Sequence, residues 1–304
     1  MSAGLVTIDA GFVGIASNSS VNIANATTTD STVGFGMYRP HSLGNFVWFD
    51  LNNNGQVDPS EQPIDGVAVS LYKPDGLGGF VLINRDTTQS GGYYLFTYLN
   101  EGDYTVVVDA DNFAVGNVLE HYLSSGTSIS VAGVQSEFVA IDPNANSAAN
   151  DDNGALVSTG IWAGGVASPA VTLGDTEPTG ETSPVPGRPD ISPDDQANYT
   201  LGFGFYTQTL SGTVWYDNDN NGLLDGAETG LGMETVELFS ADGAMFLVQV
   251  IADASGTYTF EGLAEGDYVV KVVLPDVSYI SSSGTNGSAA GPYEPGLDPE
   301  TNVL

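Results

Sequence analysis

An acidic twelve-residue segment occurs twice in this chain, as DLNNNGQVDPSE from Asp50 and as DNDNNGLLDGAE from Asp217. Each copy follows a matching aromatic segment, FVWF or TVWY. In both copies Asp, Asn or Asp, Asn, Gly and Glu fall at positions 1, 3, 5, 6 and 12, which is the spacing of a calcium-binding loop. Because a calcium ion takes about six to eight oxygen ligands, the repeated spacing predicts two calcium sites.

The ligands of each predicted site follow from loop position: side chains at 1, 3, 5 and 12, a backbone carbonyl at 7, and a contact through water at 9. The expected ligands in the first loop are Asp50, Asn52, Asn54, the carbonyl of Gln56, Asp58 and Glu61. Those in the second loop are Asp217, Asp219, Asn221, the carbonyl of Leu223, Asp225 and Glu228.

The two loops differ at position 3, where Asp219 replaces the neutral Asn52. We therefore expect tighter calcium binding at the second loop. The flanking helices of an EF-hand are missing from the pattern, so calcium is expected to fasten strands together and to play a structural role. The alternative interpretation, a pair of solvated Asn-Gly turns, does not explain the Glu at position 12.

The charge of the chain excludes several classes of partner. Only 5 Lys and Arg stand against 38 Asp and Glu, giving a formal net charge of -33 in 304 residues. Such a chain repels nucleic acid and anionic membranes, so cations are its natural partners. No apolar run is long enough to span a bilayer, so no membrane insertion is expected. The start MSAGLVTIDAGFVG is unlike a signal peptide, so an exported protein would have this chain as a mature or excised piece.

Matching segments continue beyond the loops and indicate a tandem repeat. GYYLF from Gly92 matches GTYTF from Gly256, and EGDYTVVV from Glu101 matches EGDYVVKV from Glu265. Alternation in VAVSLY, Asp-Gly turn signals and abundant Val, Tyr, Phe and Thr indicate short antiparallel strands. The sequence therefore predicts an all-β fold of tandem immunoglobulin-like or prealbumin-like antiparallel β-sandwiches with calcium-binding loops.

Three segments are expected: an N-terminal strand segment at 1–38, a first sandwich at 39–207 and a second sandwich at 208–304. The first sandwich includes a long Pro-, Gly-, Asp- and Ser-rich region, within which ALVSTGIW and VASPAVTL are predicted strands, and it ends in the predicted strand YTLGFGFY. The segment TLGFGFY from Thr200 has a near copy, TVGFGMY, from Thr32, whereas the second sandwich has no counterpart of it.

The second sandwich is therefore expected to lack its closing strand within the chain, which would leave an open core. One interpretation is that the chain was cut from a longer array. The other is that Met1–Tyr38 of a neighbouring molecule adds the missing strand, a donor-strand complementation that builds a filament.

The segments VWFDLNNNGQVDPSE, GYYLFTYLNEGDYTV and YTLGFGFY resemble the B-type repeats of bacterial serine-aspartate repeat adhesins, known as SdrD B-like domains and related to the collagen-adhesin B-type fold. The resemblance implies a calcium-binding β-sandwich that serves as a spacer or stalk, extracellular or on the bacterial cell surface. It does not explain residues 1–26. Serine-aspartate repeats and a wall-sorting tail are absent from this sequence, so cell-wall attachment is not implied.

Other chemistry finds little support in the sequence. Cysteine is absent, which excludes disulfides, thiolate catalysis and zinc sites of the Cys type. His41 and His121 stand alone, and no nucleophile elbow or phosphate-binding loop is present, so no enzyme is predicted. Lys73 and Lys271 do not align between the repeats, which argues against the isopeptide crosslink of related collagen-adhesin domains.

Two remaining features have competing interpretations. Trp48 and Trp215, which lie beside alternating apolar positions, are expected to anchor the cores in preference to serving as ligand platforms. The NDDNG run with Asp151 and Asp152 either helps to hold another calcium ion or forms an ordinary turn.

The function expected from the sequence is a non-catalytic, calcium-stabilised structural subunit of an extracellular bacterial fibre or surface stalk. Its main partner would be itself, assembled head to tail. The alternative is a cell-surface adhesin module in which residues 142–198 bind a host protein or glycan. A third possibility is a spacer attached to a secreted enzyme.

Overall fold

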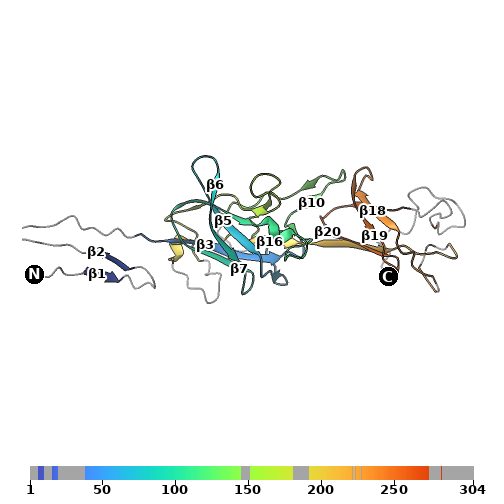
Figure 1. The fold of residues 1–304 in the computed structure, drawn as a ribbon, viewed down its shortest axis with the longest axis horizontal. Coiled ribbons are helices and arrows are strands. Elements are labelled where there is room, and N and C mark those ends of the chain that lie inside the picture. Colours follow the sequence, from blue (N-terminus) through green and yellow to red (C-terminus); the bar gives the residue numbers. More distant parts are fainter. Residues whose placement is uncertain are drawn as a thin grey trace, which may run out of the picture. The chain divides into compact units, whose positions relative to one another are not determined.

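The computed structural model describes residues 6–9, 16–19, 38–144, 151–180, 192–220, 222, 224–226, 228–273 and 282 (Figure 1). The chain forms two compact units, Met1–Arg39 and Pro40–Leu304. In the first unit, β1 (Val6–Asp9) pairs antiparallel with β2 (Ala16–Ser19). The predicted strand TVGFGMY at 32–38 lies outside the described residues except for Tyr38.

The first repeat, which opens the second unit, consists of short strands and two 3-10 turns. Its elements are β3 (His41–Phe49), β4 (Gln62–Pro63), β5 (Ala68–Pro74), β6 (Phe80–Thr87), β7 (Tyr93–Leu99), β8 (Gly102–Val108), η1 (Ala110–Phe113), β9 (Leu123–Ser124), β10 (Ser128–Ile129), β11 (Gln135–Ser136), β12 (Ala155–Leu156), β13 (Val166–Ala167), β14 (Val171–Leu173), η2 (Asp194–Gln196), β15 (Ala197–Asn198) and β16 (Phe203–Tyr206). Neither helical turn among the described residues is long or apolar enough to cross a membrane.

Most of these strands form two sheets that enclose a core, and β10 and β11 form a separate two-stranded sheet. One sheet has the order β12-β13-β8-β5-β6, with β14 also pairing with β8; the other has the order β15-β3-β16-β9, with β4 and β7 pairing with β3. Alternate residues of facing strands point inward, among them Leu71 of β5, Phe96 of β7 and Phe205 of β16, each 0% exposed. The predicted all-β sandwich is therefore confirmed for this repeat.

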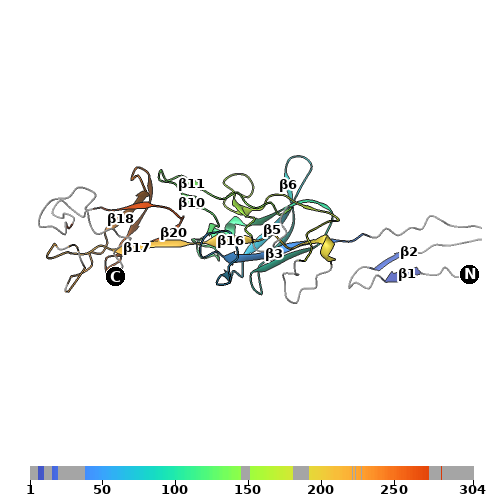
Figure 2. The same cartoon turned by 180° about the vertical axis from the view of Figure 1, so that it is seen from behind.

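The second repeat has the same strand order in a smaller form. It contains β17 (Gln208–Thr213), β18 (Thr235–Ser240), β19 (Phe246–Ile251), β20 (Thr257–Leu263) and β21 (Tyr268–Val272). Figure 2 shows β17 and β20 side by side, and β18 lies between β19 and β21 in the other sheet. Val236, Leu238 and Phe260 form its buried core.

Two predicted strands of the first repeat are shorter than expected. ALVSTGIW forms a strand only at Ala155–Leu156, because Gly160 and Gly164 adopt positive φ angles of 86° and 84° and turn the chain. The closing strand begins at Phe203 and not at Tyr199. Thr200 bonds through its N–H and hydroxyl to the Asn198 side-chain oxygen, at 3.1 and 2.8 Å, and this local turn interrupts the strand.

Each repeat has a loop end and a turn end. The first acidic loop follows the end of β3, whereas the EGDY turn that contains Glu101 lies beside the start of β3, since His41 pairs with Leu99. In the second repeat Gln208, at the start of β17, pairs with Leu263, just before the turn that contains Glu265. Both repeats therefore carry the acidic loop and the EGDY turn at opposite ends of one sheet.

Candidate metal sites

The first loop is closed by hydrogen bonds from its own backbone. Asp50 is 0% exposed, and its Oδ2 accepts the N–H of Gly55 at 2.8 Å. Glu61 accepts two backbone N–H groups, that of Leu51 on Oε1 at 2.8 Å and that of Asp58 on Oε2 at 3.0 Å. The acids at positions 1 and 12 therefore fold the intervening residues into a ring.

The second loop repeats these contacts. Asp217 Oδ2 accepts the N–H of Gly222 at 2.8 Å. Glu228 accepts the N–H of Asn218 on Oε1 at 2.7 Å and that of Asp225 on Oε2 at 3.2 Å. Two sequences that differ at half of their positions thus adopt the same local structure, which indicates that the spacing of the acids determines the loop.

The backbone turns sharply at positions 4 and 6 of both loops. Asn53 and Asn220 have φ angles of 54° and 55°, and Gly55 and Gly222 have φ angles of 71° and 79°. This left-handed region is open to Gly and is tolerated by Asn. Gly55 and Gly222 therefore make the sharp turn at position 6 of each loop.

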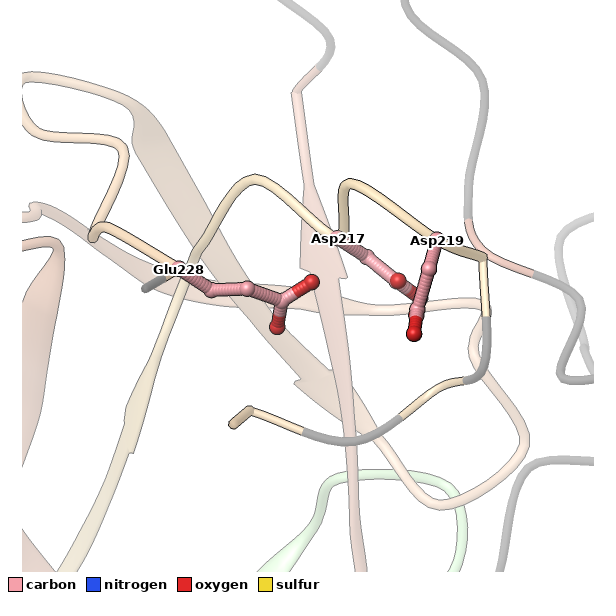
Figure 3. Close-up of side chains that lie close together, drawn as sticks. All are labelled: Asp217, Asp219 and Glu228. Atoms are coloured by element: carbon pink, nitrogen blue, oxygen red, sulfur yellow. The ribbon is translucent and has the colours of Figure 1, made fainter. Parts of the chain in front are cut away.

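Three carboxylates gather in the second loop. One oxygen each from Asp217, Asp219 and Glu228 lies within 4.8 Å of the others, and Figure 3 shows the three side chains close together. Like charges at this separation repel one another unless a cation lies between them. Asp225 is not part of this group, which fits a ligand that acts through water. The predicted ligands Asn221 and Leu223 lie outside the described residues.

The first loop brings its side chains together differently. The amide groups of Asn52 and Asn54 donate to Asp58 Oδ2 at 2.8 and 3.1 Å, and Asn54 Oδ1 accepts the N–H of Gln56 at 2.7 Å. The described part of this loop contains no group of three acids like that of the second, because position 3 is the neutral Asn52 in place of Asp219. A bound cation would need the Asn52 and Asn54 oxygens in place of these amide contacts.

The NDDNG run packs directly against the first loop. The N–H of Asp152 donates to the Gly55 carbonyl at 2.9 Å, and Asp152 Oδ1 accepts the N–H of Gly204 at 3.0 Å. Burial raises the pKa of Asp152 well above its usual value, and the negative charges of Glu137 and Asp50 raise it further. The sequence identified this run as a candidate, but its position against the first loop could not be predicted because the two segments are far apart in the sequence.

The oxygen-only donor set of both loops suits a hard cation such as calcium. The histidines stand apart from both loops and from each other. His41 is buried with Nε2 at 2.8 Å from the Gly174 carbonyl, and His121 lies 3.4 Å from Glu261.

Comparison with known proteins finds a sequence family described as the SdrD B-like domain, which matches residues 41–120 and 208–292, more than half of the chain. Similar curated proteins include the serine-aspartate repeat-containing protein F of Staphylococcus epidermidis, 26% identical over 275 residues. The serine-aspartate repeat-containing protein D of Staphylococcus aureus strain Newman is 28% identical over 261 residues. These matches cover 90% and 84% of this chain but only 12% and 15% of the relatives.

Solved structures with some similarity include a streptococcal ancillary pilin, with a TM-score of 0.32 and 11% identity, covering 92% of this chain and 69% of that one. The minor pilin GBS52 of Streptococcus agalactiae has a TM-score of 0.30 and 14% identity, covering 82% of this chain and 87% of that one. At such scores the strand pairing described above, and not the similarity, defines the architecture.

Proposed function

This chain belongs to the SdrD B-like domain family, and from that membership we propose that it is a non-catalytic, calcium-stabilised structural subunit of a bacterial fibre or surface stalk. The family and its staphylococcal relatives place it outside the bacterial cell or on its surface. The observation that carries the proposal is the identical closure of the two acidic loops, each held by the same backbone contacts to the acids at positions 1 and 12.

Calcium in these loops would stiffen each repeat. The loops follow β3 and β17 and lead to the next strands of their sandwiches, so a shared ion would fix strand ends that are otherwise joined only by a loop. A tenfold excess of calcium over the dissociation constant adds about 1.4 kcal/mol per site. Without the ion, the acids of each loop repel one another.

We further propose that copies assemble head to tail by exchange of a strand. In the first repeat, β16 pairs parallel with the end of β3, and Gly204 lies opposite Trp48. A Cβ added at Gly202 or Gly204 would lie 2.9 or 2.8 Å from the Trp48 ring. The two glycines therefore let this ring, only 1% exposed, lie against the strand.

In the second repeat, β17 pairs with β20, and no described strand takes the position that β16 has in the first repeat. Val214 is half-buried, whereas the matching Val47 is 0% exposed. Trp215 is likewise half-buried in place of the buried Trp48. The sequence at 32–38, TVGFGMY, contains the same Gly-Phe-Gly element as residues 202–204, which lead into β16. We propose that this element of another copy covers Trp215 and closes the second sandwich.

Electron microscopy of purified protein tests the assembly. With calcium we expect filaments, which are lost when residues 1–38 are deleted, while the first repeat retains its thermal transition. Gly36→Val should also prevent filaments, because the added side chain would meet Trp215, and Gly4→Val serves as the matched control. Filaments that survive both the deletion and Gly36→Val would contradict strand exchange.

A second candidate function is adhesion. Among the described strands β6 lies at the edge of its sheet, and Phe80, Val81, Leu82 and Ile83 are 40 to 50% exposed along it. An exposed apolar edge strand can accept a strand of another protein. One relative, 26% identical over 88% of this chain, is named the Bone sialoprotein-binding protein of Staphylococcus aureus. Saturable binding of bone sialoprotein by the full chain, abolished by Leu82→Lys, would support a function as an adhesin.

A further inference from the structure

The two repeats of Pro40–Leu304 meet at the first acidic loop. Asn53, at the tip of the loop, donates from Nδ2 to Glu265 Oε2 of the second repeat at 3.0 Å. Its own repeat holds the same side chain: Nδ2 lies 3.2 Å from the Thr127 carbonyl, and Oδ1 accepts the N–H of Gly126 at 2.6 Å. Asn53 is only 6% exposed, whereas Glu265 is exposed, so the contact lies at the edge of the junction.

The backbone around Glu265 is held as well. The Glu265 carbonyl accepts the N–H of Ile129 at 2.8 Å, and its N–H donates to the Tyr206 hydroxyl at 3.1 Å. Gly266 lies so near Ile129 that an added Cβ would be 2.4 Å from Cγ2. The EGDY turn of the second repeat is therefore seated on the loop end of the first.

A second contact supports the same junction. The N–H of Asp242, in the turn between β18 and β19, donates to the Val131 carbonyl of the first repeat at 3.1 Å. Gly133, in the turn between β10 and β11, approaches Met245 so closely that an added Cβ would lie 2.9 Å from its sulfur. Two turns of the second repeat thus contact the first.

Charge makes this junction sensitive to the ion. The Glu265 carboxylate approaches a loop that contains Asp50, Asp58 and Glu61. Without a cation these like charges repel Glu265, and a divalent ion in the loop opposes most of that repulsion. Calcium in the first loop would therefore favour docking of the second repeat.

Each repeat also has one residue that matches a partner of this contact but lies at the end of the repeat that faces away from the junction. Asn220 occupies the position of Asn53 in the second loop, with φ angles of 55° and 54°. Glu101 occupies the position of Glu265 in the EGDY turn of the first repeat and is exposed. At the same end of the first repeat, Leu77 in the turn after β5 and Tyr98 near the end of β7 are 93% and 52% exposed, so apolar side chains are available for burial against another repeat.

We propose that the acidic loop of one repeat is the docking site for the EGDY turn of the next, and that a second copy of this chain docks through Glu101 against Asn220. The inference rests on the proposed calcium sites and adds the residues that join one repeat to another. The internal junction indicates that the partner is another copy of this chain. The EGDY turn at Glu101 has the same four residues as the turn at Glu265, which already contacts an acidic loop.

Sedimentation of the full chain in calcium tests the contact between copies. Glu101→Gln and Asn220→Ala should each weaken self-association about tenfold to hundredfold, as expected for loss of one charge-assisted hydrogen bond. Asp267→Asn, which also removes one exposed acid from an EGDY turn, is the matched control and should leave association unchanged. Equal association of Glu101→Gln and the unchanged chain, or no association of the unchanged chain, would overturn the proposal.

The internal junction provides a second measurement. Because the chain has no cysteine, spin labels can be attached specifically at Thr87→Cys in the first repeat and Gln249→Cys in the second. We expect a narrow distance distribution with calcium, a broad one with chelator, and a broad one for Asn53→Ala even with calcium. Isothermal titration of calcium distinguishes failure of the proposed calcium sites from failure of the proposed junction. Absence of calcium binding would refute the proposed function, whereas normal binding with an unchanged distribution in Asn53→Ala would refute only this inference.

Discussion

Replacing Glu228 by glutamine should remove the calcium-dependent stability of the second repeat and leave the first unaffected. Glu228 accepts two backbone N–H groups, at 2.7 and 3.2 Å, and lies within 4.8 Å of Asp217 and Asp219. Extracellular calcium modules have dissociation constants of about 10^-4 to 10^-3 M, so about 10 mM calcium is a tenfold to hundredfold excess. Calcium should then add about 1.4 to 2.7 kcal/mol to the free energy of unfolding.

For a domain of this size, about 1 kcal/mol corresponds to about 4 to 8 °C in the unfolding temperature. Differential scanning calorimetry should therefore show the second-repeat transition rising by about 6 to 20 °C in calcium, and Glu228→Gln should lose most of that rise. In chelator two effects oppose each other, because the variant relieves repulsion among the four acids but its single amide oxygen can accept only one of the two backbone N–H groups. Glu234→Gln in the same repeat is the control. A variant that keeps the full calcium-induced rise would refute the reasoning.

Three other outcomes follow from the structure. Gly204→Ala should lower the free energy of unfolding of the first repeat by about 1 to 3 kcal/mol in urea titration, because its Cβ would lie 2.8 Å from the Trp48 ring; Gly174→Ala, with open space around it, should have no effect. Leu238→Ala should lower the free energy of unfolding of the second repeat by about 2 to 5 kcal/mol, so that only the calorimetric transition of that repeat moves to lower temperature. In chelator, the free energy of unfolding should fall as pH rises from about 4 through the raised pKa of Asp152, since folding favours its protonated form, and Asp152→Asn should flatten this slope.

The elements that the sequence predicted well are those determined by nearby residues. Asp50 and Glu61 are eleven positions apart along one loop, so their spacing alone indicated the ring that both repeats form. The alternation in β5 likewise indicated which of its residues, such as Leu71, face the core. Matching segments then extended the prediction to the second repeat.

The features that the sequence did not reveal depend on distant contacts. Asn53 lies between ligand positions and has no motif of its own, and its partner Glu265 is 212 residues away. Asp152 is buried because β16 and the first loop close over it, which no local pattern indicates. The predicted strand after Ala155 was too long because Gly160 could not be recognised in advance as a left-handed turn residue.

Isothermal titration of calcium into protein stripped of metal tests the central claim most directly. The account predicts two calcium ions bound per chain, one of them lost in Glu61→Gln and the other in Glu228→Gln. No heat of binding, together with an unfolding temperature that a chelator leaves unchanged, would contradict it.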